Sequence, residues 1–122
     1  MPQSDNNLRM DYIEFPATDI EATKRFYHQV FGWDFQDWGP SYTSFHDGRL
    51  GGGFNTEAQP SRAGADETRG VLVVLYATSL EDIYAKVKQA AGKIVRETFE
   101  FPGGRRFHFA DPNGNERAVW SE

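Results

Sequence analysis

The sequence predicts an α+β fold in which two βαβββ modules follow one another and form a curved eight-strand sheet with a cavity. Three observations support this prediction. One helix pattern occurs twice at a spacing of 60 residues, each copy follows a short apolar strand pattern, and each copy precedes three further strand patterns separated by turn residues. Such a module covers one face of its sheet with its helix, so the open faces of two modules can enclose a cleft.

The repeated helix pattern covers residues 18–32 and 78–92 and matches without a gap. Apolar and small residues recur at helical spacing in the same phase, and each copy ends on a glycine suited to a left-handed residue. We therefore interpret the two stretches as one structural unit used twice. The predicted capping pairs are Thr18 with Glu21 and Ser79 with Asp82, and the predicted terminal glycines are Gly32 and Gly92.

Strand patterns with intervening turn residues surround both helices. We expect a single domain over residues 8–122, after an irregular lead-in at 1–7. A polar connector rich in proline and glycine, residues 55–70, separates module one (about 8–54) from module two (about 71–121). The predicted strands are 9–15, 33–38, 41–45 and 49–54 in the first module, and 71–77, 93–99, 105–109 and 115–121 in the second.

Composition restricts the possible functions. A chain of 122 residues is long enough for one domain with a real core. The net charge of -5 and the lack of a long basic cluster argue against nucleic acid as a partner. There is no cysteine, no signal-peptide pattern and no membrane-length apolar run, so we expect a cytoplasmic protein with neither disulfides nor thiolate chemistry. The aromatic content of 15% favours a cavity lined partly by rings.

Two sequence motifs carry a resemblance to a known family. FYHQVFGW at the end of the first helix and DPNGN before the last strand are its most specific pieces. From about Leu8 to Ser121 the chain resembles the glyoxalase, bleomycin-resistance and extradiol-dioxygenase superfamily, also called vicinal oxygen chelate (VOC) proteins. It is most similar to the small, single-domain, glyoxalase-like members. The resemblance implies the paired βαβββ fold, a homodimer, and a small-molecule site in the cavity of each sheet.

The resemblance also implies four positions at which relatives hold a divalent metal. The first-strand position, seven residues before the acid that opens the first helix, is Tyr12, and the repeat relates it to Leu72. The last-strand position, seven residues after the aspartate of the DPNGN turn, is Ala118, and matching the two meanders relates it to Gly52. Only Tyr12 has a donor atom in its side chain, whereas a hard cation needs several. We therefore predict no metal cofactor.

Glu14 is the candidate catalytic residue. It lies two residues after Tyr12, on the strand face that should point into the cavity. Among the rings of Tyr12, Trp38, Tyr76 and Trp120 it would be a desolvated carboxylate with a raised pKa, suited to moving a proton next to a carbonyl. The alternative is a structural hydrogen bond or ion pair at the mouth of the cavity.

Apolar and aromatic residues on the predicted cavity faces form the candidate ligand-binding set. They would make a mostly apolar pocket with a phenol to orient a ligand, although the same rings would also serve to fill the interior of the sheet. The set consists of Tyr12, Trp38, Phe54, Leu72, Val74, Tyr76, Ala118 and Trp120, with Phe54 and Trp120 paired by the repeat.

The three histidines are weaker candidates. His28 lies among charged neighbours and is expected in solvent, and His46 lies at a hairpin turn. His108, between two phenylalanines on a strand, is expected to be partly buried. A satisfied structural histidine is favoured there over a catalytic base or a ligand.

Two further motifs are candidates for ligand contact, namely the triple glycine 51–53 and the pair Arg105–Arg106. No helix with a lysine follows the glycines, so a close backbone approach to a ligand or partner subunit is favoured over a phosphate loop. The arginines follow a hairpin turn, where a solvated edge is favoured over contact with an anionic ligand.

Three functional classes stay open from the sequence. The first is a metal-independent protein that binds a small organic molecule in an aromatic cavity. The second is a lyase or isomerase that uses only protein side chains, with Glu14 as acid or base and a tyrosine as donor. The third is a metal-dependent, lactoylglutathione-lyase-like enzyme with displaced ligands, for which Glu14, His46 and His108 are the first candidates. A second copy of the chain is the expected protein partner in each case.

Overall fold

The structure is a computed structural model that describes residues 3–57 and 71–122. The first module contains β1 (Tyr12–Pro16), α1 (Ile20–Phe31), β2 (Asp34–Asp37), β3 (Tyr42–His46) and β4 (Gly51–Asn55). The second contains β5 (Val73–Tyr76), α2 (Leu80–Gln89), β6 (Lys93–Phe101), β7 (Gly104–Ala110) and β8 (Glu116–Ser121). The α+β class and the tandem βαβββ order are therefore confirmed. The lead-in contains a short 3₁₀ helix, η1 (Gln3–Asn6), with no buried residue, and most of the predicted connector lies outside the described residues.

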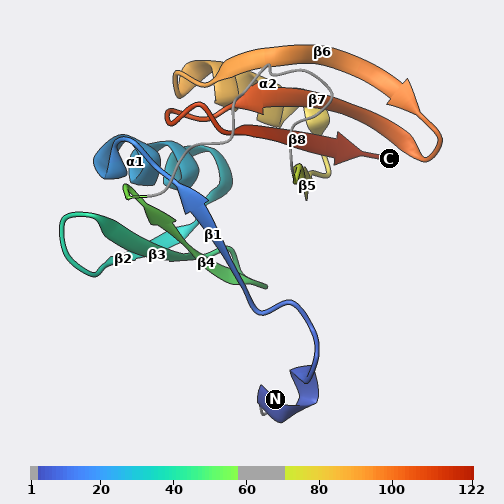
Figure 1. The fold of residues 1–122 in the computed structure, drawn as a ribbon. Coiled ribbons are helices and arrows are strands. Elements are labelled where there is room, and N and C mark those ends of the chain that lie inside the picture. The colour runs from blue at the N-terminus through green and yellow to red at the C-terminus, as the bar shows by residue number, and fades with distance from the viewer. Residues whose placement is uncertain (1–2, 58–70) are drawn as a thin grey trace.

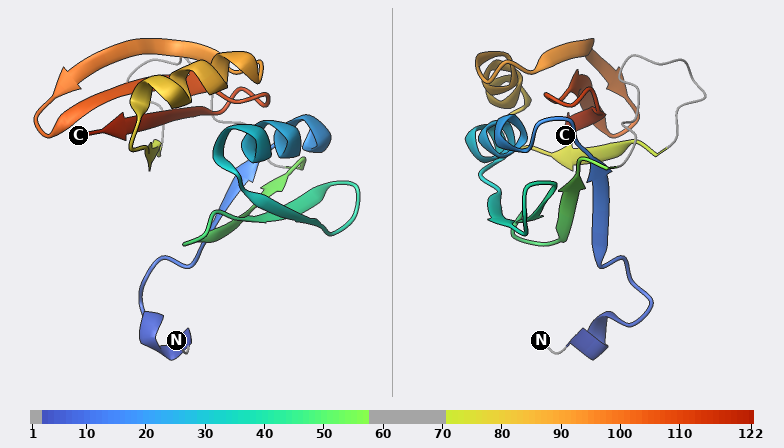
Figure 2. Two further views of the ribbon diagram at one scale, coloured as in Figure 1. Left: turned by 180° about the vertical axis from the view of Figure 1, so that it is seen from behind. Right: turned by 60° about the vertical axis from the view of Figure 1, so that its left-hand side comes forward.

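The strands form two four-stranded sheets with the same topology (Figures 1 and 2). Their orders are β1-β4-β3-β2 and β5-β8-β7-β6, and in each sheet the first and last strands pair in parallel. Among the described strands no ladder joins the two sheets, so the eight predicted strands are divided between them. β1 begins at Tyr12, later than the predicted residue 9, because its neighbour β4 begins opposite it at Gly51.

The two modules share one aromatic core. Tyr27 of α1 is fully buried and stacks on Trp33, with ring centroids 4.5 Å apart, and it also contacts Phe54 of β4. On the same helix, Phe26 lies 5.7 Å from Phe109 of β7. Since α1 packs on residues of both sheets, it is the element through which the modules are joined. Burial of the apolar face of α1 on both sides stabilises the contact between the modules.

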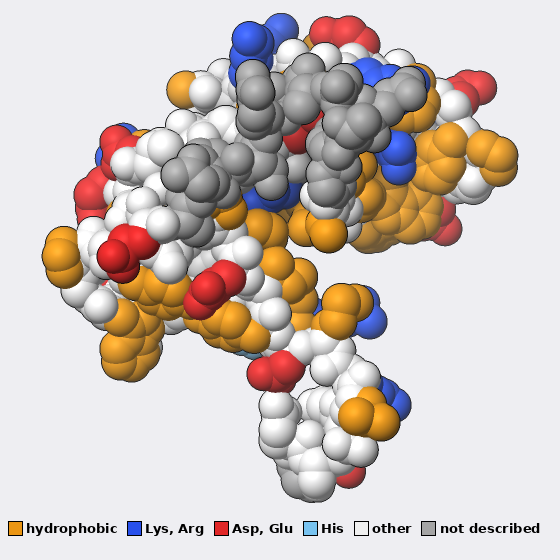
Figure 3. All heavy atoms as spheres, in the orientation of Figure 1, with side chains coloured by type: hydrophobic (Ala, Val, Ile, Leu, Met, Phe, Trp, Pro, Cys, Tyr) orange, Lys and Arg blue, Asp and Glu red, His pale blue; other side chains and the backbone are white. Residues whose placement is uncertain are grey.

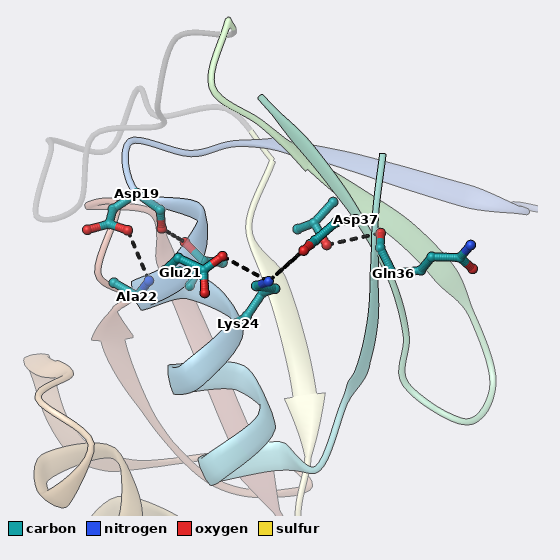
Figure 4. A network of polar contacts seen from close by, with 8 residues as sticks. Asp19, Glu21, Ala22, Lys24, Gln36 and Asp37 are labelled. Carbon is teal, nitrogen blue, oxygen red and sulfur yellow. Dashed lines mark hydrogen bonds and ion pairs between the residues drawn. The ribbon is translucent and has the colours of Figure 1, made fainter. Parts of the chain in front are cut away.

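The N-termini of the helices are capped by side chains. Asp19 caps α1, because its carboxylate accepts a hydrogen bond from the Ala22 N–H at 3.0 Å (Figure 4). The predicted cap, Thr18, is therefore wrong by one residue. Ser79 caps α2 as predicted and accepts from the Asp82 N–H. Each cap satisfies one of the free donors in the first helical turn.

The C-termini of the helices differ between the modules. Gly32 ends α1 with φ 75°, as its sequence predicts. At the end of α2, Ala91 takes the left-handed conformation with φ 68°, so the prediction for Gly92 is wrong. Gly92 is required for another reason, because a Cβ there would lie 2.7 Å from the Phe26 ring. The second glycine thus allows α1 to approach closely.

Lys24 ties α1 to the outer strand of the first sheet (Figure 4). Its ammonium lies 2.9 Å from carboxylate oxygens of both Glu21, on the same helix, and Asp37, at the end of β2. These hydrogen bonds raise the pKa of Lys24, with Asp37 making the largest contribution. The pairs are partly exposed, so their role is to orient β2 rather than to add much stability.

The DPNGN turn, residues 111–115, joins the second module to the first through hydrogen bonds, and we call it the clasp. The Asn113 Oδ1 accepts a hydrogen bond from the Thr18 N–H at 2.7 Å, and the Asn113 amide nitrogen donates to the Thr23 hydroxyl oxygen at 2.8 Å. The Asn115 amide donates to the Pro16 carbonyl at 2.8 Å. Asp111 holds the turn itself by accepting from the N–H groups of Asn113 and Asn115, both at 2.9 Å. The motif that carries the family resemblance is therefore structural in this chain.

Candidate functional site

The open face of the first sheet carries a hydrogen-bonded group of two phenols and a carboxylate. The Tyr42 hydroxyl donates to Glu14 Oε2 at 2.9 Å, and the hydroxyls of Tyr12 and Tyr42 are 2.6 Å apart. Since the single proton of Tyr42 is used on Glu14, Tyr12 donates to Tyr42. Burial raises the pKa of Tyr42 well above its usual range, and the bonds to Tyr12 and Glu14 raise it further. Tyr42 therefore stays protonated and acts as a donor.

Tyr42 was not among the candidates from the sequence. The signal was available in the alternation of its strand, where the neighbouring Thr43 and Phe45 are buried and Tyr42 and Ser44 take the other face. Trp38 lies beside this face, with its indole N–H donating to the Ser44 hydroxyl at 2.9 Å, and 62% of its surface is exposed.

The glycine run makes room for the chain's own rings. A Cβ on Gly53 would overlap the Tyr42 phenol on the open face, while one on Gly52 would overlap the Phe45 ring and the Ile13 carbonyl on the core side. The predicted close approach is real, but aromatic side chains of the same chain make it. Substitution at Gly53 would displace the phenol that contacts Glu14.

The open face of the second sheet is aromatic. Tyr76 and Trp120 are opposite each other on β5 and β8, with ring centroids 5.0 Å apart, and the Tyr76 hydroxyl donates to Glu122. Val74 lies on the same face opposite Ala118. Tyr76 and Val74 are 51% and 41% exposed, so these apolar groups meet solvent in the single chain.

His108 and Glu116 form a buried pair on this second face. His108 Nδ1 is 2.7 Å from Glu116 Oε2, and the two side chains are 3% and 2% exposed. Burial lowers the pKa of His108, against the opposing effect of Glu116, so the ring is neutral near pH 7. The predicted burial of His108 is confirmed. By contrast, His46 is exposed at its turn, and His28 contacts the Trp33 carbonyl through Nδ1 at 3.0 Å.

The strand register corrects two predicted positions. Glu14 is opposite Gly53 on β4, and its repeat mate Val74 is opposite Ala118 on β8. The position equivalent to Ala118 is therefore Gly53 and not Gly52. By the same shift Phe54 corresponds to Val119, and it is fully buried in the core instead of lining the open face with Trp120. A one-residue error exchanges the two faces of a strand, because side chains alternate.

The predicted pocket is divided between the two sheets in the single chain. Within residues 3–57 and 71–122, no hydrogen bond or ring contact joins the Tyr12–Glu14 group to Tyr76 or Trp120. Glu14 is also exposed, whereas the sequence predicted a carboxylate shielded among rings. The reason is that the modules meet through their helix-side core, which leaves each open face to itself.

The residues at the family's metal positions do not fit a divalent metal. After the register correction these positions hold Tyr12, Gly53, Leu72 and Ala118, and only the phenol offers a donor atom. In the described parts of the chain no group of three or more His, Asp or Glu is arranged to hold an ion. The suggested displaced ligands do not meet either, because Glu14 and His46 belong to the first sheet and His108 to the second.

One surface hollow lies away from both open faces. It is on the helix side of the second sheet, where the Tyr84 hydroxyl donates to Glu97 at 2.7 Å. Its lining consists of Leu80, Glu81, Tyr84, Glu97 and Thr98. The described helices include none that is long and apolar enough to cross a membrane.

Comparison with known proteins identifies the family. The profile described as the Glyoxalase/Bleomycin resistance protein/Dioxygenase superfamily matches residues 9–119. The chain belongs to this superfamily. Its fold is the one predicted from the resemblance to this superfamily. A comparison with curated protein sequences found no match.

Solved structures of other superfamily proteins share the fold at low sequence identity. A glyoxalase-related enzyme from Fulvimarina pelagi has a TM-score of 0.74 and 21% identity, over 94% of this chain and 88% of that one. Lactoylglutathione lyase from Agrobacterium tumefaciens has a TM-score of 0.69 and 21% identity, over 93% of both chains. The fosfomycin resistance protein FosX from Mesorhizobium loti has a TM-score of 0.72 and 13% identity, over 94% of this chain and 92% of that one. At these identities the likeness extends to the fold alone.

Proposed function

We propose that this superfamily member binds a small organic molecule against the aromatic open faces of its sheets, without the family's metal. The observation that carries the proposal is the exposure of the rings on both faces: Tyr12, Trp38 and Tyr76 are 48%, 62% and 51% exposed. Exposed apolar patches of this kind mark binding surfaces. Names of structural neighbours, which include a fosfomycin resistance protein and a lactoylglutathione lyase, agree with a small-molecule role.

A second copy of the chain completes the site in this proposal. Neither open face is closed by the other module, and an organic molecule on one sheet alone would keep much of its surface in water. Ligand sites usually bury most of the ligand surface. The first-sheet face of one copy, which is rich in hydroxyls, and the second-sheet face of another, which is rich in apolar rings, would together offer a ligand both hydrogen-bonding groups and apolar contact surface.

Native mass spectrometry of the untagged protein tests both statements together. We expect a dimer that carries an adduct of small-organic mass, and we expect the adduct to persist after dialysis against EDTA, because no metal holds it. A bare monomer that also fails to bind naphthyl probes would contradict the proposal. An adduct that leaves with the chelated metal would contradict its metal-free part.

Acid–base catalysis by Glu14 is the second candidate function. It is favoured by the Tyr42 hydroxyl, which fixes Oε2 and leaves Oε1 without a hydrogen bond from the described residues. Where turnover accompanies binding, Glu14→Gln should retain binding and lose turnover. Glu97→Gln is the matched control, because Glu97 also accepts from a tyrosine but lies on the helix side of the other sheet. Equal turnover in both variants would remove Glu14 from the chemistry.

A further inference from the structure

A row of cations and rings lies on the open face of the second sheet, across β6 and β7. The Arg96 guanidinium lies over the Phe99 ring, 3.7 Å from its centroid. The Arg106 guanidinium lies 5.3 Å from the same centroid and 5.7 Å from that of Phe101. The register explains this grouping, because Arg96 is opposite His108 and Phe99 is opposite Arg106. All of these side chains therefore share one face.

The aromatic part of the row continues to the opposite edge of the sheet. The rings of Phe101 and Trp120 are 6.2 Å apart, and Trp120 contacts Tyr76. Figure 3 shows hydrophobic side chains gathered over this end of the second module, with basic side chains next to them. The face thus offers flat apolar surface immediately beside two guanidinium groups.

The two arginines of this face have no acidic partner in the described parts of the chain. Among the described residues neither Arg96 nor Arg106 has a carboxylate within ion-pair distance, whereas the neighbouring Arg105, on the helix side, pairs with Glu81. In the described parts of the chain, the Nε–H donor of Arg106 is buried without a hydrogen-bond partner. A buried polar atom left unpaired costs free energy, so this face is incomplete without a further group.

We propose that this face binds a small aromatic carboxylate. The inference rests on the proposed function and specifies the class of ligand. The carboxylate meets the guanidinium of Arg106, with Arg96 beside it, and the ring of the ligand packs on Phe101 and Trp120. Planar guanidinium groups match carboxylates through paired hydrogen bonds, and they also stack on rings.

Two carboxylates near this face, those of Glu116 and Glu122, are offset by the two guanidinium groups of Arg96 and Arg106. Glu116 is held by His108, and Glu122 accepts from Tyr76. The open face of the first sheet has the opposite character, because its Glu14 has no basic partner among the described residues and would repel an anion. Charge complementarity therefore assigns the ligand's anionic end to the second sheet.

Calorimetric titration of the full chain with 1-naphthoate and with its neutral analogue 1-naphthamide tests the inference. We expect naphthoate to bind at least about tenfold more tightly than naphthamide, since a charge-assisted contact is lost in the amide. Arg106→Gln should abolish this preference, because it should weaken the binding of naphthoate far more than that of naphthamide. Arg105→Gln, one residue away on the other face of β7, should retain the preference.

The possible outcomes separate this inference from the proposed function. Equal binding of the two probes, with no effect of Arg106→Gln, would overturn the anionic ligand and leave small-molecule binding intact. Failure of both probes to bind would overturn the proposed function and this inference with it. Arg106→Lys covers the case in which the glutamine variant does not fold, and we expect it to keep only part of the preference, because an ammonium cannot form the paired contact.

Discussion

The two modules have the same strand order and opposite chemistry on their open faces. The first sheet presents two phenols and an exposed carboxylate over a glycine strand. The second presents arginines and aromatic rings around a buried His108–Glu116 pair. A shared topology therefore places equivalent positions in equivalent directions, while the residues at those positions decide what each face can bind. The two modules therefore share their strand order, whereas the side chains on their open faces differ.

The turns before β4 and β8 differ in the same way. In the first module the Asp47 carboxylate accepts from the N–H groups of Arg49 and Leu50, and its turn is exposed. In the second, Asn113 and Asn115 reach across to the first module from buried positions. In the part of the chain that the structure describes, the second of these two turns is the one that forms hydrogen bonds between the modules. A comparison of substitutions at paired positions can therefore measure how far the two modules have diverged.

Adjacent glycines of β4 give the largest expected contrast between the core face and the open face. Gly52→Ala should lower the free energy of unfolding by about 3 kcal/mol or more, because its Cβ overlaps the Ile13 carbonyl and the Phe45 ring, which the core prevents from moving. Gly53→Ala should cost about 1 kcal/mol, because the end of the Tyr42 ring can swing away into solvent. Urea unfolding measures both, and equal losses would refute the assignment of the two faces.

The clasp gives the second contrast. Asn113→Ala should lower the free energy of unfolding by about 2 kcal/mol, because it leaves the Thr18 N–H without its acceptor and removes the hydrogen bond that the Asn113 amide donates to the Thr23 hydroxyl oxygen. Asp47→Ala, at the corresponding exposed turn, should cost about 0.5 kcal/mol. Chemical denaturation of the two variants under the same conditions is the measurement. A larger loss for Asp47 would mean that the second turn does not join the modules.

The pH dependence of stability gives the smallest expected effect. The folded-state pKa of His108 is lowered by burial, so as pH falls through about 6.5 the unfolded chain binds a proton before the folded chain does. This group therefore opposes folding increasingly as pH falls from 7 to 5. His108→Gln should flatten that part of the profile, whatever its effect on absolute stability. His46→Gln, at an exposed turn of the first module, should leave the slope unchanged, and identical slopes for all three proteins would contradict the burial effect.

Much of the fold was predictable because it depends on local pattern. Helical spacing, Ser79 as a cap and Gly32 as a terminator are properties of short stretches, and the structure confirms them. Errors of one residue occurred where several residues could serve, as with Thr18 and Asp19 at the first cap. The sequence paired Ala118 with Gly52 instead of Gly53 because the two meanders differ in turn length. A constant sequence offset therefore could not give the correct strand register.

The candidate site was predictable only in part. Period-2 alternation correctly grouped Tyr12 with Glu14, and Tyr76 with Val74, on single strand faces. It could not reveal that Tyr42 would reach Glu14, or that His108 would pair with Glu116, since both contacts cross between strands. Nor could it predict that Arg105 would pair with Glu81 and Arg106 would not, because that difference depends on which face of β7 meets α2.

Sequence alone therefore determined the module and its duplication, because these follow from residue identity and periodicity along the chain. The tertiary structure decided how the modules meet. They pack through α1 and one aromatic core, and the Asn113 clasp holds that arrangement. Packing between distant segments has no local signature, so only the folded chain shows that the two open faces are separate and differently charged.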